Sequence, residues 1–235
     1  DTIVGYVGLG NLPTGSEDPY ALRRAARGVL GVLLKHNYRL DIGELAQIAA
    51  ESLPQQINQS QPGLLADKTW DFLVSRLENL FLASGYRIDL VRSVLGARLG
   101  SRDVVDVRNR LDALTEISSD LDFEPLTTTF KRVMNIVPDA EVPSVDSKYL
   151  NDAAEVLLYE IYLERAENIS SLLERENYTS ALREIAGLRG HVDKFFSEVL
   201  VMDEDETLRN NRLGLLSEIG HLFSKIADFT KIVST

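Results

Sequence analysis

The chain has 235 residues, no cysteine, and 36 acidic against 25 basic side chains, which gives a net charge of −11 at pH 7. This length is enough to bury the core of one large or two ordinary domains. The lack of cysteine excludes disulfides and thiolate metal sites, and glycine and proline break every apolar segment well short of the roughly 18 residues that a membrane-spanning helix needs. Because no basic and apolar signal segment is seen at the start, we expect a cytoplasmic protein without a membrane partner.

The spacing of apolar residues predicts helices throughout the first half of the chain. Asp18 and Pro19 are typical of the N-cap and first position of a helix, which should run to about Leu34. A second helix is expected over about residues 41–52, and the segment 54–63, rich in Gln, Asn and Ser, is typical of a linker. Further helices are expected at about 64–84, 86–97 and 102–118.

The second half is predicted to be helical as well. A short helix containing the sequence FKRVMNI should follow Pro125, and a polar loop with Pro138 and Pro143 should come next. Long helices are then expected near 146–175, 178–201 and 204–233. In the last of these, Asp203 to Glu206 are typical of an N-cap with an acidic first turn, and the apolar stripe that follows should give about seven helical turns. No segment alternates like a strand, so the sequence predicts an all-α fold built as a multi-helix array.

Motifs for catalysis or cofactor binding are weak in this sequence. His36, His191 and His221 are far apart, none has an HxxxH or HExxH spacing, and no His-Asp dipeptide is present to supply the metal pair of an HD phosphohydrolase. The glycines of GYVGLG have the order GxxGxG and follow no strand, which differs from a dinucleotide fingerprint. We therefore predict no catalytic, metal-binding or cofactor-binding residue.

Three segments resemble one known family. They are DTIVGYVGLGNLPTGSEDPYALRRAARGVLGVLL at 1–34, FEPLTTTFKRVMNIV at 123–137 and MDEDETLRNNRLGLL at 202–216. The first resembles the end of the HD-like helical domain of the bacterial glycyl-tRNA synthetase beta subunit, and the other two resemble the start and the last helix of its DALR-type anticodon-binding domain. Because the chain begins at Asp1, without a methionine and inside the first motif, we expect a C-terminal fragment of a longer subunit.

The resemblance also implies how the chain is divided and what it does. The expected parts are the end of an HD-like domain, a helical intermediate region and a DALR-type bundle, at residues 1–60, 61–122 and 123–235. The partner would be a separate alpha subunit, which holds the aminoacylation site that uses glycine and ATP, in an α2β2 assembly. This chain would recognise tRNA(Gly), holding the anticodon arm through phosphate contacts and unstacked bases. It is expected to need no cofactor, to bind no DNA and to catalyse nothing alone.

Two alternatives remain open. Arginyl-tRNA synthetases share the DALR-type domain, although the first 60 residues favour the glycyl beta subunit. A helical scaffold that binds only protein would suit the charge of −11, because RNA attracts basic surface. The charge is uneven, however: residues 141–235 hold 18 acids and 10 bases, whereas residues 86–110 hold six arginines and three aspartates. Because salt screens charges that are more than about 8–10 Å apart, a basic face can exist on an acidic chain.

Six residues in the two DALR-like segments are the predicted tRNA contacts: Lys131, Arg132, Asn135, Arg209, Asn210 and Arg212. Lys131 and Asn135 are four residues apart and share a helix face. The two arginines of the last segment are three residues apart, and would present guanidinium groups to phosphates or base edges. The alternative is that these side chains pair with local acids such as Glu206 or cap a neighbouring helix. For Arg23 and Arg24, contact with RNA and a tie between the HD-like region and the following helices are both open.

Overall fold

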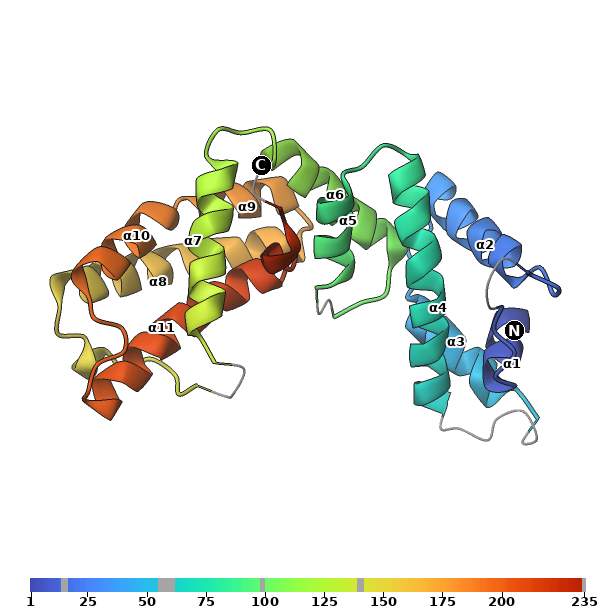
Figure 1. The fold of residues 1–235 in the computed structure, drawn as a ribbon, viewed down its shortest axis with the longest axis horizontal. Helices are drawn as coiled ribbons and strands as arrows, with labels where there is room; N and C mark the ends of the chain where they lie inside the picture. The colour runs from blue at the N-terminus through green and yellow to red at the C-terminus, as the bar shows by residue number, and fades with distance from the viewer. Residues whose placement is uncertain (14–16, 55–61, 98–99, 139–141, 234–235) are drawn as a thin grey trace. The chain divides into compact units, whose positions relative to one another are not determined.

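The computed structural model describes residues 1–13, 17–54, 62–97, 100–138 and 142–233. Over these residues the regular elements are α-helices and two short 3-10 helices, and an isolated antiparallel bridge joins Asp41 to Asp103 (Figure 1). The predicted all-α fold is therefore confirmed. Within the same residues, no helix has the length and apolar character needed to cross a membrane.

The chain divides into two compact units, residues 1–91 with 99–109 and residues 92–98 with 110–235. Helices α5 (Ile88–Leu95) and α6 (Val104–Ile117) contribute residues to both units. The domain boundaries at residues 60 and 122 that the sequence suggests stay a prediction.

Helix α4 organises the first unit by packing against three shorter helices (Figure 1). In α2, the buried residues Leu22, Ala26, Leu30 and Leu33 recur every three or four positions, as one face of a helix requires. This spacing explains why the helix was visible in the sequence. The helices of this unit are α1 (Thr2–Gly8), α2 (Leu22–His36), α3 (Ile42–Glu51) and α4 (Pro62–Ala83).

The start of α2 differs from the prediction. The helix begins at Leu22 and not at Pro19, and its N-cap residue is Ala21, whose φ of 55° lies in the left-handed region. The Asp18 carboxylate still accepts hydrogen bonds from the first backbone N–H groups of the helix, at Leu22 (2.8 Å) and Arg23 (3.0 Å). Asp18 therefore caps α2 from one turn upstream, because the backbone of Ala21 donates to the Asp18 carbonyl and closes a turn between them.

Asp41 joins the first residues of α3 to the segment before α6. Its carboxylate caps α3 by accepting from the backbone N–H of Glu44 at 3.1 Å, and it also accepts from the backbone of Arg102 (2.8 Å) and the hydroxyl of Ser101 (3.1 Å). Burial opposes the charge of Asp41, but these hydrogen bonds outweigh it and lower the pKa of the carboxyl. A salt bridge of 2.5 Å between Arg39 and Asp103 adds a second link. Together these contacts explain why residues 99–109 belong to the first unit.

The predicted linker at 54–63 is helical at its end. Helix α4 begins at Pro62, a residue type that suits the first turn because its missing N–H is not needed there. Residues 55–61 lie outside the described part of the chain.

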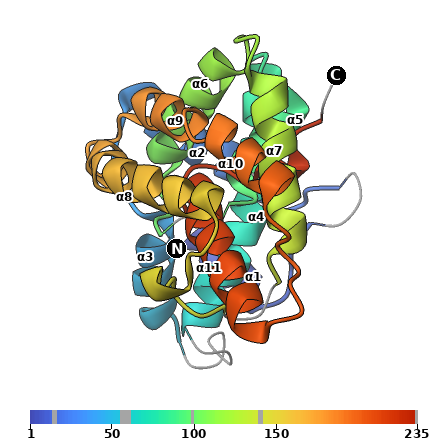
Figure 2. The same ribbon diagram turned by 90° about the vertical axis from the view of Figure 1, so that its left-hand side faces the viewer.

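Helix α11 occupies the centre of the second unit, where it packs against α7, α8 and α9 (Figures 1 and 2). Three aromatic rings hold one end of this core: Phe130 of α7, Phe223 of α11 and Phe229 of the 3-10 turn η2 have centroids 4.4 to 5.2 Å apart. The elements are α7 (Phe123–Ile136), η1 (Ser147–Tyr149), α8 (Ala153–Glu174), α9 (Tyr178–Ala186), α10 (Arg189–Glu198), α11 (Glu206–Ser224) and η2 (Phe229–Lys231).

The long helix expected over 178–201 is two helices. Helix α9 ends at Ala186 and α10 starts at Arg189, yet apolar residues on both sides of the break are buried. Gly187 lies at the break, where a Cβ atom would come within 2.3 Å of the Arg165 guanidinium. Arg165 pairs with Glu184 at 3.0 Å and donates to its carbonyl at 3.2 Å. The continuous apolar spacing therefore hid a break beside which α8 contacts the end of α9.

The last helix is shorter than predicted. Helix α11 ends at Ser224, after about five turns, and the chain continues into η2. Phe229 and Ile232 remain buried because the backbone N–H of Asp228 donates to the Ser93 carbonyl at 2.8 Å and turns the chain back onto the core. Val233, the last residue of the predicted helix, is 64% exposed.

Two other helix starts also differ from the prediction. Helix α7 begins at Phe123, two residues before Pro125, because proline is tolerated in a first turn. Helix α8 begins at Ala153 and not near residue 146, because Asp152 and Glu155 form a capping box at that point.

Candidate functional site

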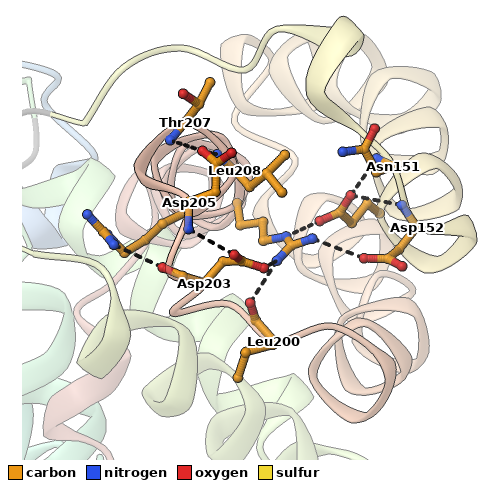
Figure 3. Close-up of polar contacts among 10 residues, drawn as sticks. Asn151, Asp152, Leu200, Asp203, Asp205, Thr207 and Leu208 are labelled. Atoms are coloured by element: carbon orange, nitrogen blue, oxygen red, sulfur yellow. Dashed lines mark hydrogen bonds and ion pairs between the residues drawn. The ribbon is translucent and has the colours of Figure 1, made fainter.

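Arg212 of α11 lies at the centre of an ion-pair network that joins α11 to α8 and to the loop before α11 (Figure 3). Its Nη1 lies 2.8 Å from Asp203, its Nη2 lies 3.0 Å from Asp152, and its Nε pairs with Glu155. Nη1 also donates to the carbonyl of Leu200 at 2.8 Å. The Arg212 side chain is 5% exposed and that of Glu155 is fully buried.

Helix capping fixes the carboxylates of this network. Glu155 accepts from the backbone N–H groups of Asn151 (2.8 Å) and Asp152 (3.1 Å) at the start of α8 (Figure 3). Burial opposes the charge of Arg212, but Glu155 and Asp203 outweigh it and raise the pKa of the guanidinium. The backbone N–H of Asp205 and then Arg212 lower the pKa of Asp203. Both shifts favour the charged forms of Arg212 and Asp203, which the ion pair between them needs.

This network changes the interpretation of Arg212. The sequence prediction that Arg212 presents its guanidinium to RNA does not fit a side chain that is buried and paired with three carboxylates. The structure favours the alternative, a structural ion pair, and Arg212 contributes to the packing of α8 against α11.

Arg209 and Asn210 lie in the first turns of α11. The N-cap predicted at the start of this helix is Asp205, which accepts from the backbone of Thr207 (2.8 Å) and Leu208 (3.3 Å). Arg209 donates to the Asp203 carbonyl at 2.9 Å and lies 4.0 Å from Glu206, and its side chain is 29% exposed. Asn210 is half-buried. These two side chains remain on the accessible side of the helix start.

Lys131, Arg132 and Asn135 of α7 have different degrees of exposure. Lys131 is half-buried and its Nζ donates to the Ile232 carbonyl at 2.5 Å. Arg132 is exposed and stacks over the ring of Phe196, 4.0 Å from its centroid. Asn135 is exposed. Lys131 therefore holds η2 in place, whereas Arg132 and Asn135 face outward.

The predicted contacts fall into two groups. Val133 and Met134 of α7 lie against Gly220 of α11, where a Cβ atom would be 3.6 and 3.1 Å from them. Arg209 comes 11 positions before Gly220, which is about 16 Å along a helix. The structure thus places the α7 group near one end of α11 and the Arg209 group near the other.

A hollow of about 520 Å³ lies along α11. Gly214 forms part of its wall, because a Cβ atom there would lie 2.5 Å from the Pro143 carbonyl oxygen, so only glycine lets this loop approach α11. Asn210 precedes Gly214 by four positions and therefore lies on the same helix face. The lining residues are Val142, Pro143, Ser144, Gly214, Ser217, Glu218 and His221.

Glu218 is the acidic group of this hollow, and Tyr162 of α8 fixes its position. The Tyr162 hydroxyl donates to Glu218 at 3.0 Å, and burial together with Glu218 raises the pKa of Tyr162 to about 12. None of the residues that line this hollow is among the predicted tRNA contacts. The signal for it was the spacing of Gly214, Ser217 and His221 at three and four positions, which places small and polar residues on one helix face.

Neither the glycines of GYVGLG nor the histidines form a catalytic arrangement. Gly5 and Gly8 lie inside helix α1, so GYVGLG does not form a phosphate-binding loop. In the residues that the structure describes, no three His, Asp or Glu side chains are arranged to hold a metal ion.

Comparison with known proteins gives matches over both units. Residues 1–96 match the family described as glycyl-tRNA synthetase beta subunit, and residues 126–233 match the DALR anticodon binding domain. Over 234 residues and the whole of this chain, the glycine–tRNA ligase beta subunits of Geobacter metallireducens and Geotalea daltonii are 42% and 39% identical. That of Syntrophus aciditrophicus is 36% identical over 234 residues. The chain spans about a third (34%) of the length of each of these relatives.

Proposed function

Because the chain belongs to the glycyl-tRNA synthetase beta-subunit family, we propose that it recognises tRNA(Gly) through the anticodon arm. The observation that carries this proposal is the match of residues 126–233 to an anticodon binding domain, since these residues form most of the second unit. The match of residues 1–96 to the glycyl beta subunit counts against the arginyl-tRNA synthetase alternative.

The wider part of the proposal concerns the complete enzyme. The chain works with an alpha subunit in an α2β2 assembly, in the cytoplasm, and the alpha subunit uses glycine and ATP. This chain alone is non-catalytic. An ATP–pyrophosphate exchange signal from the purified chain would contradict that statement. We also retain the proposed division into an HD-like end at 1–60, an intermediate region at 61–122 and a DALR-type domain at 123–235.

The second unit offers groups for both kinds of RNA contact. Arg132 and Arg209 are the proposed phosphate contacts, because guanidinium groups bind phosphate oxygens well. Asn135 and Asn210 are proposed to contact bases, and Lys131 adds positive charge behind them. These basic residues can attract RNA although the second unit is acidic, because salt screens the charges of distant acids.

The hollow along α11 suits an unstacked base. Every glycine codon begins with two guanines, so the pairing anticodon bases are cytosines, whose exocyclic amino group donates hydrogen bonds. Glu218 is an acceptor of the type that recognises this group, and the His221 ring and Pro143 offer flat surfaces beside it. Tyr162 keeps the carboxylate in one orientation.

A tRNA titration at several salt concentrations tests the proposal. The chain should bind tRNA(Gly) with an affinity that falls as salt rises, and changing the two anticodon cytosines should weaken binding further. Glu218→Gln keeps the size of the side chain and should reduce the difference between the two tRNAs. Equal binding of both tRNAs by the parent chain would leave only non-specific attraction, and no binding would favour the protein scaffold that the charge of −11 suits.

A further inference from the structure

A second hollow, of about 510 Å³, lies in the first unit between α2 and α4. Three of its lining side chains are arginines and the other two are neutral and polar: Arg23, Arg27, Ser75, Arg76 and Asn79. Arg23 and Arg27 are four residues apart on α2, and the other three lie within about one turn of α4, so each helix presents one short row of donors. This concentration of positive charge stands out in a chain with a net charge of −11.

Contacts with neutral groups hold two of the guanidinium groups in place. Arg76 lies over the ring of Phe72, 3.8 Å from its centroid, and its Nη1 donates to the Phe72 carbonyl (2.8 Å) and to the Ser75 hydroxyl (2.5 Å). Arg23 donates to the carbonyls of Pro13 (3.2 Å) and Glu17 (3.4 Å). The contacts of Arg76 fix the direction of its guanidinium group and bring no negative charge to it.

Arg23 and Arg76 repel each other. Burial and the nearby charge of Arg23 lower the pKa of Arg76, while Asp18 acts in the opposite direction. The Asp18 carboxylate is already used to cap α2. An anion between α2 and α4 would relieve this repulsion and accept hydrogen bonds from both rows.

We propose that this hollow binds a phosphate group of an RNA backbone. Guanidinium groups match phosphate oxygens in pairs, and Ser75 and Asn79 are among the side chains that commonly bond to RNA phosphates and sugars. The hollow is open and larger than one phosphate needs, which suits a group carried on a polymer. The site lies outside residues 126–233, so it is a second contact, remote in sequence from the anticodon-binding domain. The choice of RNA as the source of the phosphate rests on the proposed function.

Arg27→Gln is the main test, with Arg24→Gln as the matched control. Arg27 lines the hollow, whereas Arg24 is an exposed arginine of the same helix that does not line it. The tRNA affinity of the full chain is measured over a range of salt concentrations. Arg27→Gln should weaken binding and reduce the slope of log K against log salt by about one, whereas Arg24→Gln should leave the slope unchanged. Melting curves of both variants serve as the control that the fold is kept.

A second arm uses inorganic phosphate and separates the possible sources. An unchanged slope in Arg27→Gln, or an equal change in both variants, would overturn the proposal. A different result would also overturn it: inorganic phosphate raises the melting temperature of the parent but not of Arg27→Gln, and the tRNA affinity is the same in both. That result would define a site for free phosphate. The loss in Arg27→Gln should be the same for tRNA(Gly) and for the anticodon-changed tRNA. If the parent binds both tRNAs equally but Arg27→Gln still reduces the salt slope of binding by about one, the anticodon proposal fails and the phosphate site stands.

Discussion

Helix α2 of the first unit and helix α11 of the second contain the same kinds of residue, but an arginine and a glycine are exposed in α2 whereas an arginine and a glycine are covered by other elements in α11. Both have arginines in their first half and two glycines further along. In α11, Arg212 is enclosed by carboxylates and Gly214 is covered by the 143–145 segment. In α2, Arg27 lines an open hollow beside two other arginines, and a Cβ atom at Gly28 would meet open space.

The comparison shows that residue type alone does not identify a binding group. A buried arginine that is paired with a buried acid, as Arg212 is with Glu155, holds helices together, because removing either partner would leave an uncompensated charge. An exposed arginine that lines a hollow beside other arginines, as Arg27 does, is placed to bind an anion. The second unit therefore uses Arg212 for packing, while the hollow of the first unit leaves Arg27 exposed to solvent.

The largest expected effect is that of Arg212→Ala. Removing this guanidinium leaves the fully buried Glu155 and the Asp152 carboxylate without their partner, and should lower the free energy of unfolding by about 3–5 kcal/mol. Urea denaturation of the full chain measures the loss. A variant with unchanged stability and lost tRNA affinity would return Arg212 to the RNA-binding surface and break the comparison.

Replacing a glycine by alanine should lower the stability of the chain at Gly214 and raise it at Gly28. In Gly214→Ala the new Cβ atom lies 2.5 Å from the Pro143 carbonyl oxygen, and the overlap should destabilise the chain by roughly 1–3 kcal/mol. Gly28→Ala meets nothing within 4 Å on an exposed helix position, and should stabilise by roughly 0.5–1 kcal/mol. Thermal unfolding of the two variants gives both signs. A loss of stability in both would show that α2 is also covered in solution.

A carboxylate of the first unit gives a smaller and pH-dependent effect. The pKa of Asp41 is lower in the folded chain than its ordinary value of about 3.9, so its charged form stabilises the fold above that pH, and this contribution is lost as the pH falls through the folded pKa. Asp41→Asn keeps an N-capping side chain but removes the charge. It should cost about 0.5–1 kcal/mol at pH 7, and the difference between parent and variant should shrink as the pH falls below the ordinary pKa and through the folded one, as measured by denaturation over a series of acidic pH values. A gap between parent and variant that is constant with pH would contradict the charge explanation.

Most helices could be predicted because their apolar residues recur every three or four positions in the sequence. The errors lie at helix ends, where partners from other elements decide the geometry. The apolar spacing around Gly187 is continuous although the helix breaks there, and the side chain of Arg165 of α8 lies beside that glycine. Asp18 was identified as a capping residue, but its turn with Ala21 moved the start of α2.

The candidate site was less predictable for the same reason. The pairing of Arg209 with Glu206 was anticipated because the two are three residues apart. The partners of Arg212 on α8, Asp152 and Glu155, are 60 and 57 residues away in sequence, so the network is invisible without the fold.

The smallest stability effect is expected at Arg209, and it sharpens the comparison within one helix. Arg209→Ala removes a bond to the Asp203 carbonyl (2.9 Å) and a contact of 4.0 Å with Glu206, both near the surface. Such a change should alter the free energy of unfolding by no more than about 0.5 kcal/mol. If Arg209 contacts a phosphate, the salt slope of tRNA binding should fall by about one, and if it reads a base the cost should be about 1–3 kcal/mol in binding. Melting curves and tRNA titrations of Arg209→Ala and Arg212→Ala, run side by side, should then separate the two arginines. Arg209→Ala should lower the tRNA affinity and keep the stability of the chain, whereas Arg212→Ala should lower the stability. A lower melting temperature with unchanged tRNA affinity in Arg209→Ala would withdraw this residue from the proposed surface and leave Arg132 as its phosphate contact.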